Sequence, residues 1–268
     1  MNKLDTFEGM HKKSKPIILL NIWDRNSAES LLKNGIKLLA TSSYAMSNNY
    51  SYDDGENMPF SELLRHCNNL PLKDGLLTID IESGYADDVN GLEENMKKLL
   101  RLDVVGINIE DKISKLDNLY TIEEQSRRIA AIKKICSLMN KDIFVNVRTD
   151  VYFNSNIEKN NMSDLCLEET RNRIMAYKNS GANGIFIPGL KNKKHIESLS
   201  EEGMPINIML DIEDDNIGDY LDIGVSRISF GPSIYRLHCK SQKKNVDLLV
   251  NRILKKLKNY GDRIQLFG

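Results

Sequence analysis

The sequence predicts an α/β fold, namely a (β/α)8 TIM barrel with an additional C-terminal helix. The length of 268 residues fits one such barrel. Eight short apolar runs alternate with amphipathic segments of helical length. Most of these runs are almost continuously apolar, which is typical of parallel strands buried on both faces. An open parallel sheet is the alternative that the same pattern allows.

The predicted strands and helices alternate along the whole chain. The strands cover residues 16–20, 37–41, 76–81, 105–109, 143–147, 184–187, 206–209 and 227–230. The helices between them cover residues 27–34, 60–68, 91–102, 121–140, 164–180, 193–201 and 216–222, and another at 4–13 precedes the first strand. Eight strand–helix units in one chain favour a closed barrel over an open sheet.

A long basic helix is predicted after the last strand, at residues 243–259. Its apolar residues recur close to the helical period, at Val246, Leu249, Val250, Ile253, Leu254 and Leu257. This stripe can pack on its own barrel or on a neighbouring subunit. We therefore predict one domain over residues 1–268, with the barrel at about 16–236 and a helical extension at about 241–260.

The composition restricts the partners of the protein. Its 37 basic and 38 acidic residues almost cancel, which argues against nucleic acid as the main partner. No apolar run approaches the roughly 20 residues of a membrane span, and residues 1–15 are polar, without the apolar core that is typical of a signal peptide. The four cysteines are scattered, as expected in a reducing compartment. We expect a cytoplasmic protein without a membrane or nucleic-acid partner.

Charged side chains stand at the ends of three predicted strands. Asp80 and Glu82 end the third strand, Glu110 ends the fourth, and Arg148 ends the fifth. The C-terminal ends of barrel strands meet at one rim, so these side chains are expected to lie together. Oxygen ligands from several strands suit Mg²⁺ or Mn²⁺. The sequence thus predicts a metal site with Asp80, Glu82 and Glu110 as ligands.

Two of these residues have alternative interpretations. Carboxylates often cap helices, but Asp80 stands in an apolar run where an unpaired charge is costly, which favours a metal role. Arg148 can form a structural ion pair with one of the acids. Its planar guanidinium also suits a substrate carboxylate or phosphonate, and the sequence leaves both alternatives open.

Eight motifs carry a resemblance to a known family. They are Asn21-Ile-Trp-Asp24, Ala40-Thr-Ser-Ser43, Asp53-Asp-Gly-Glu56, Asp80-Ile-Glu-Ser-Gly-Tyr85, Gly106-Ile-Asn-Ile-Glu-Asp111, Asn146-Val-Arg-Thr-Asp150, Gly184-Ile-Phe-Ile-Pro-Gly189 and Gly231-Pro-Ser-Ile-Tyr-Arg236. In this order they resemble the isocitrate lyase/phosphoenolpyruvate mutase family, over nearly the whole chain. The resemblance implies a Mg²⁺-binding barrel that makes or breaks C–C or P–C bonds in small oxo- or hydroxy-carboxylates, through an enolpyruvate-like intermediate.

The resemblance also implies roles for individual residues. Asp80 resembles the principal metal ligand, assisted by Asp54, Glu82 and Glu110, partly through water. Arg148 and Asp54 are the expected catalytic residues. The substrate carboxylate is expected at Ser43 and the backbone of Tyr44. The rim positions of Trp23 and Asn146 add these two residues to the expected substrate-binding set, together with Arg148.

Departures from the family pattern narrow the expected activity. Isocitrate and methylisocitrate lyases carry a Lys-Lys/Arg-Cys-Gly-His segment, whereas residues 111–120 here contain neither cysteine nor histidine. We therefore expect a lyase or phosphonomutase-like enzyme that is neither of those two lyases. Tyr44 replaces a small residue and should narrow the carboxylate pocket. The alternative is a non-catalytic barrel that binds a small carboxylate or serves as an interaction module.

The last helix of this family is commonly exchanged between subunits. The resemblance therefore implies a homodimer or homotetramer, formed in part through the helix predicted at residues 243–259.

Overall fold

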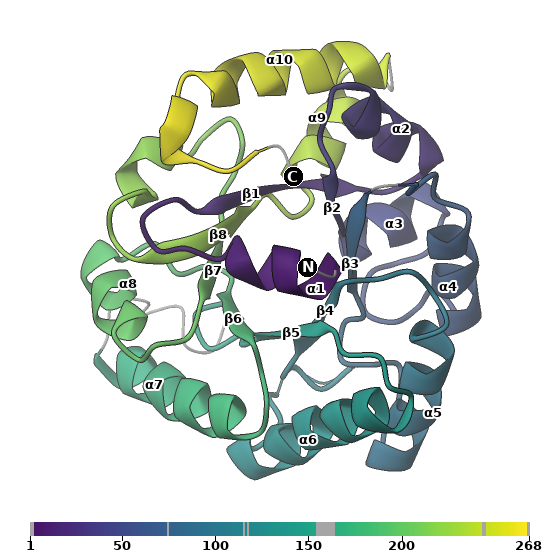
Figure 1. Ribbon diagram of the computed structural model, residues 1–268, viewed down its shortest axis with the longest axis vertical. Helices are drawn as coiled ribbons and strands as arrows, with labels where there is room; N and C mark the ends of the chain where they lie inside the picture. Colours follow the sequence, from purple (N-terminus) through teal and green to yellow (C-terminus); the bar gives the residue numbers. More distant parts are fainter. Residues whose placement is uncertain are drawn as a thin grey trace.

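The chain folds into a closed barrel of eight parallel strands, which confirms the predicted fold class (Figure 1). A computed structural model describes residues 3–266, apart from 74, 115, 117, 154–163 and 243–244. The strands are β1 (Ile17–Ile22), β2 (Leu38–Thr41), β3 (Leu76–Asp80), β4 (Gly106–Glu110), β5 (Phe144–Arg148), β6 (Gly184–Ile187), β7 (Ile206–Met209) and β8 (Val225–Ser229). Because β1 pairs with both β2 and β8, the sheet closes and the open-sheet alternative is wrong.

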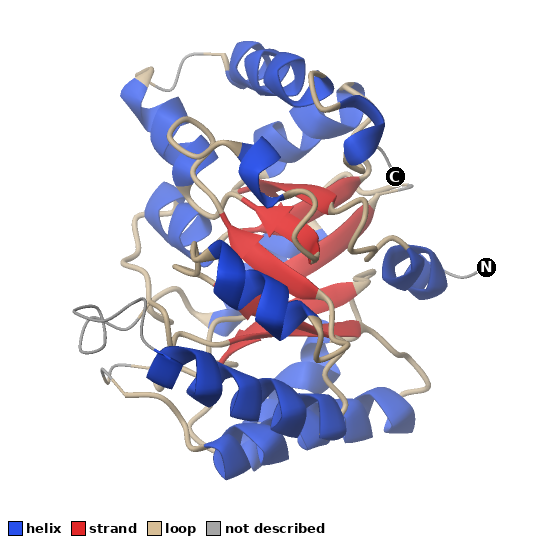
Figure 2. Ribbon diagram, turned by 90° about the vertical axis from the view of Figure 1, so that its left-hand side faces the viewer, coloured by secondary structure: helices blue, strands red, loops and turns tan. Residues whose placement is uncertain are grey.

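Helices surround the barrel on its outer side, except for α1, which lies across the N-terminal end of the barrel (Figures 1 and 2). They are α1 (Lys3–Gly9), α2 (Arg25–Lys33), α3 (Ser43–Asn49), α4 (Phe60–Asn68), α5 (Val89–Leu99), α6 (Ile122–Leu138), α7 (Asp164–Asn179), α8 (Lys193–Ser200), α9 (Ser233–Lys240) and α10 (Val246–Lys258). The helix predicted at 216–222 is only a 3₁₀ turn, η2 (Ile217–Tyr220), and a second turn, η3 (Gly261–Arg263), follows α10.

Two short helices, α3 and α9, are absent from the sequence prediction. Each has about two turns, too few for a helical period to stand out. The start of α3 does carry a local signal, because the side chain of Ser42 accepts a hydrogen bond from the backbone N–H of Ala45. Both helices directly follow a barrel strand and help to form the rim at its C-terminal end.

The extension α10 packs on the same chain in this structure. Its buried residues Val250, Ile253 and Leu254 face the barrel, and α10 contacts α2. Lys33 of α2 lies 3.4 Å from the carboxylate of Asp247. Exchange of α10 between subunits stays a prediction. Among the described residues, no helix is both long enough and apolar enough to cross a membrane.

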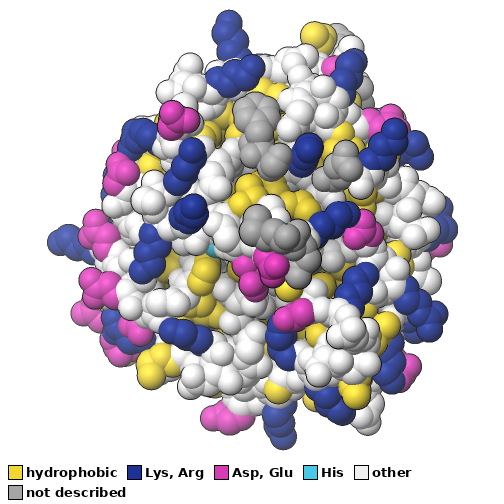
Figure 3. All heavy atoms as spheres, in the orientation of Figure 1, with side chains coloured by type: hydrophobic (Ala, Val, Ile, Leu, Met, Phe, Trp, Pro, Cys, Tyr) yellow, Lys and Arg dark blue, Asp and Glu magenta, His cyan; other side chains and the backbone are white. Residues whose placement is uncertain are grey.

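The inside of the barrel changes from apolar to polar along its axis. At the N-terminal end, α1 covers an apolar layer in which Phe7 packs against Phe144 with ring centroids 5.4 Å apart. Figure 3 shows this face of the molecule, on which basic and acidic side chains are interspersed. Nearer the C-terminal end, Asn146 donates hydrogen bonds to Asn108 at 2.9 Å and to Asn207 at 3.2 Å. This polar layer lies beneath the rim at the C-terminal ends of the strands.

The ring of His11 is enclosed at the N-terminal end of the barrel. It stacks on Phe144 with centroids 4.2 Å apart, and its Nδ1 lies 2.8 Å from the carbonyl oxygen of Phe7. Burial lowers the pKa of His11 to about 3, and the positive charge of Arg227 adds to this effect. The folded protein therefore holds this imidazole neutral.

Asp111, the residue after β4, is an anchor between β4, β5 and α7. Its side chain is fully buried and accepts hydrogen bonds from Arg173 at 2.9 Å, from the hydroxyl of Tyr177 at 3.0 Å and from the backbone N–H of Asp150 at 3.1 Å. Since these contacts fix the ends of β4 and β5, they also fix the direction in which Glu110 and Arg148 leave the sheet.

The neutral state of His11 predicts a pH-dependent stability. The unfolded chain takes up a proton near pH 6.5 and the folded state only near pH 3, so stability is lost as the pH falls below 6.5. In urea unfolding between pH 7 and pH 5, His11→Gln should remove up to about 1.4 kcal/mol per pH unit from this slope. The matched change His66→Gln, at a histidine nearer the surface, should remove less. Equal slopes in wild type and His11→Gln would contradict the prediction.

The buried contacts of Asp111 predict that two arginines of α7 contribute very differently to the stability of the protein. Arg173→Met leaves the carboxylate of Asp111 buried without its cation, which should lower the free energy of unfolding by about 3–5 kcal/mol. Arg171→Met removes an arginine whose ion pairs with Glu168 and Glu202 lie at the surface, and should cost about 1 kcal/mol or less. Chemical denaturation of both variants tests this, and similar losses would refute the anchor role.

Candidate active site

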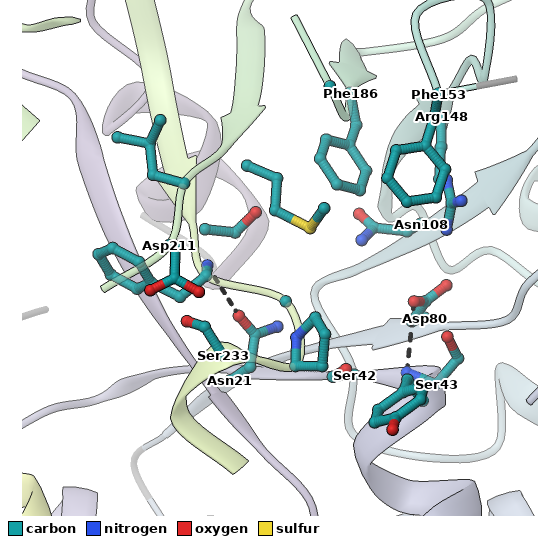
Figure 4. A pocket seen from close by; sticks show the side chains of 18 of the residues that line it. Asn21, Ser42, Ser43, Asp80, Asn108, Arg148, Phe153, Phe186, Asp211 and Ser233 are labelled. Carbon is teal, nitrogen blue, oxygen red and sulfur yellow. Dashed lines mark hydrogen bonds between the residues drawn. The ribbon is translucent and has the colours of Figure 1, made fainter. Parts of the chain in front are cut away.

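A cavity of about 490 Å³ opens at the C-terminal ends of the strands. Five residues that the sequence predicts for the site line it: Ser43, Tyr44, Asp54, Asp80 and Arg148. Figure 4 shows Ser43, Asp80 and Arg148 on one side of the cavity and Asp211 and Ser233 on the other. The predicted rim therefore contains a cavity, and Asp54, Asp80 and Arg148 all line it.

Asp80, the last residue of β3, is held in place from two sides. Its backbone N–H donates to the hydroxyl of Thr41 at 2.8 Å. One carboxylate oxygen accepts the backbone N–H of Ser43 at 3.4 Å, and the other accepts that of Glu82 at 3.2 Å (Figure 4). Burial raises the pKa of Asp80, an effect opposed by Arg148 and increased by Asp54. These contacts leave the carboxylate fixed at the cavity wall.

Asp54 reaches the cavity from the loop between α3 and α4. The residue is exposed at the rim, but its carboxylate is crowded by the wall. Burial of the carboxylate raises the pKa of Asp54, whereas a hydrogen bond with the side chain of Ser43 and the charge of Arg148 lower it. Ser43 thus contacts Asp54 through its side chain and Asp80 through its backbone.

Arg148 is bound between two carboxylates. Its Nη1 lies 2.9 Å from Glu110, and its Nε and Nη2 donate to Asp150 at 2.6 and 2.7 Å. Glu110 and Arg148 are direct partners in the register of β4 and β5. The ion-pair interpretation of Arg148 is therefore confirmed, and the guanidinium also lines the cavity, where an anionic ligand can reach it.

Glu82 lies beneath the cavity wall, where hydrogen bonds hold its carboxylate. Only 3% of the residue is exposed, and its carboxylate accepts the backbone N–H of Glu56 at 2.7 Å and the hydroxyl of Tyr85 at 2.8 Å. Glu56 in turn accepts the backbone N–H of Tyr85 at 2.6 Å. Burial raises the pKa of Glu82 to about 8, with repulsion from Asp54 and Asp80 adding to it. These bonds join the loop of Asp54 to the loop after β3.

The predicted metal ligands do not form one direct ligand set. Of Asp80, Glu82 and Glu110, only Asp80 lines the cavity, because Glu82 is engaged by Glu56 and Tyr85, and Glu110 by Arg148. Within the described part of the chain, no three His, Cys, Asp or Glu side chains are grouped as metal ligands.

The donor chemistry nevertheless fits Mg²⁺. Burial raises the pKa of Asp54, Asp80 and Glu82, and repulsion from neighbouring carboxylates adds to this effect at Asp80 and Glu82, so negative charge is crowded here. A hard divalent cation relieves such crowding, and Mg²⁺ commonly takes one or two carboxylates and completes its shell with water. Asp80 is the residue placed to be a direct ligand, with Asp54 beside it.

Two predicted substrate-binding residues do not line the cavity. Trp23 is 2% exposed and packs against Tyr235 and His238, with ring centroids 5.3 Å away in each case, because its side chain fills the space between β1 and α9. Asn146 is 1% exposed and belongs to the polar layer under the floor. Both stand near strand ends, but strand position alone does not say which side chain reaches the surface of the cavity.

The cavity also contains residues that the sequence prediction missed. Asn108 lies on the floor two residues before Glu110, so the alternation of a strand could have identified it. Lys191 pairs with Asp215 at 2.8 Å, and the guanidinium of Arg236 lies 5.0 Å from the ring centroid of Tyr44. These come from loops and from α9, where the sequence carries no period that would bring them together.

Comparison with known proteins identifies the family. The model of the phosphoenolpyruvate phosphomutase family matches residues 7–249. An uncharacterized protein of Mycobacterium tuberculosis is 28% identical over 231 residues, which are 86% of this chain and 83% of that protein.

Solved structures show the same likeness. The structure of a "putative phosphonomutase" from Burkholderia cenocepacia J2315 is 30% identical, with a TM-score of 0.84 over 90% of this chain and 97% of that one. A phosphonopyruvate hydrolase in complex with oxalate and Mg²⁺ has the same fold, with 17% identity and a TM-score of 0.77 over 91% of this chain and 85% of that one. The match over most of its length shows that this chain belongs to the phosphoenolpyruvate phosphomutase family.

Proposed function

We propose that the protein is a Mg²⁺-dependent enzyme that makes or breaks a C–C or P–C bond in a small oxo- or hydroxy-carboxylate. An enolpyruvate-like intermediate would carry the reaction. The observation that carries this proposal is the single cavity wall on which Asp80, Asp54, Ser43 and Arg148 meet, in a chain of this family.

Each residue of the wall has a chemical role in this proposal. Mg²⁺ held by Asp80 would supply a Lewis acid that stabilises an enolate oxygen. Arg148, held by Glu110 and Asp150, binds the carboxylate of the substrate and stabilises developing negative charge. Ser43 orients Asp54 through its side chain and Asp80 through its backbone N–H. The raised pKa of Asp54 suits a group that holds or takes up a proton.

The choice of oxalate as a probe follows from the comparison. Oxalate has the charge and planar shape of the enolate of pyruvate, and the phosphonopyruvate hydrolase of the same fold is seen with oxalate and Mg²⁺. The wall described above offers a carboxylate for the metal and a guanidinium for the anion. We expect Mg²⁺ and oxalate to bind together at this wall.

The second candidate is a non-catalytic barrel that binds a small carboxylate or acts as an interaction module. The ring of Tyr44 favours it, because it lies in the cavity beneath Arg236 and takes space from the carboxylate site. The short segment at residues 111–120 also favours it, because it contains no cysteine that could donate a proton. Lys112 pairs with Leu119 in this segment, and residues 115 and 117 lie outside the described residues. Turnover of an oxo-acid or a phosphonate would decide for the enzyme.

The proposal predicts a joint effect of Mg²⁺ and oxalate on stability. A ligand that binds only the folded state raises the free energy of unfolding, by about 2.7 kcal/mol at one hundred times its dissociation constant. Wild type should gain stability in thermal or chemical unfolding with both ligands and much less with either alone. Asp80→Ala should abolish the joint gain, whereas Asp53→Ala, an exposed acid outside the cavity lining, should keep it.

Two results would contradict this assignment. A full joint gain in Asp80→Ala would place the metal elsewhere. No gain in wild type under any combination would remove the support for an enolate site, and the interaction module would become the better interpretation. A positive result justifies a screen of small oxo-acids and phosphonates for turnover.

A further inference from the structure

Arg227 is a fully buried cation inside the barrel. It lies on β8, only 1% of the residue is exposed, and it is the largest fully buried side chain of the described chain. No Asp or Glu of the described residues forms an ion pair with it, and its Nε and Nη1 have no hydrogen-bond partner among them. Burying a charge in this way is costly, so the position calls for a compensating interaction at longer range.

The geometry connects Arg227 to the cavity through one residue. Its Nη2 donates to the side-chain oxygen of Asn108 at 3.3 Å. Asn108 lies on the cavity floor and is the direct partner of Asp80 in the register of β3 and β4. The guanidinium therefore stands one layer below the wall that carries Asp80 and Arg148.

The charges on the two layers are complementary. The wall contains the carboxylates of Asp54 and Asp80, and the positive charge of Arg148 is already engaged by Glu110 and Asp150. A charge inside the barrel acts over a longer distance than one in water, because little solvent screens it. Burial lowers the pKa of Arg227 to about 9, and the negative charge of Asp80 opposes this change.

We propose that Arg227 is an electrostatic positioning residue for the cavity. From below the floor, its positive charge strengthens the binding of an anionic carboxylate ligand and weakens the binding of the divalent cation alone. The site is thereby biased towards binding cation and anion together. This inference rests on the proposed function, since it concerns the same Mg²⁺ and carboxylate site.

The test uses two affinities that should change in opposite directions. Isothermal titration calorimetry measures the affinity of Mg²⁺ alone, and then that of oxalate at saturating Mg²⁺, corrected for magnesium oxalate in solution. Arg227→Met, which removes the charge and keeps most of the volume, should bind Mg²⁺ about threefold to tenfold more tightly and oxalate more weakly by a similar factor. Arg227→Lys, which keeps the charge, should bind both Mg²⁺ and oxalate with affinities close to those of wild type.

Thr78→Val is the matched control. Thr78 is 2% exposed inside the same barrel, its hydroxyl has no partner among the described residues, and the change involves no charge. Both affinities should stay within about twofold of wild type, because no charge is altered. If Arg227→Met does not fold, Arg227→Gln removes the charge while keeping a donor towards Asn108, and carries the same prediction.

The outcomes separate this inference from the proposed function. If wild type binds Mg²⁺ and oxalate but the uncharged variants lose affinity for both, Arg227 has only a structural role and the inference is overturned. Unchanged affinities in these variants would overturn it as well. If wild type binds no oxalate with Mg²⁺, the proposed function fails and this inference falls with it.

Discussion

The ion pairs of Arg148 with Glu110 and Asp150 are the interaction on which the cavity wall depends. Glu110 and Asp150 are buried or nearly so, and without the guanidinium between them they would repel each other and Asp80. The pairs also connect the ends of β4 and β5, since Glu110 and Arg148 are register partners. A wall rich in carboxylates can therefore persist in a folded barrel, and one face of the arginine still reaches the cavity.

The groups around this wall are fixed by buried polar contacts rather than by loop packing alone. Asp111 fixes the strand ends through Arg173 and Tyr177. Glu82 joins two loops through Glu56 and Tyr85. Preorganised charges of this kind do not have to reorganise when negative charge develops on a substrate, which is the usual source of electrostatic catalysis. The proposed action of Arg227 from one layer below depends instead on the weak screening of a charge inside the barrel.

The sequence predicts the barrel well, because buried parallel strands appear as apolar runs and end in charges at the site. The strand ends predict Asp80 and Arg148 as site residues, and the family motifs predict Asp54. Trp23 and Asn146 were predicted for the cavity but lie beneath its surface, since strand position fixes the end of the barrel but not the depth of a side chain. The Lys191–Asp215 pair and Arg236 come from separate loops and helices, whose meeting only the three-dimensional structure shows.

Asp80 and Arg148 are proposed to form one site, with a metal at the first and an anion at the second. A crystal structure of the protein grown with Mg²⁺ and oxalate tests this most directly. We expect Mg²⁺ on the carboxylate of Asp80, and oxalate next to the metal on the side of Ser43 and Arg148. Oxalate or Mg²⁺ bound elsewhere, with this wall unchanged, would contradict it.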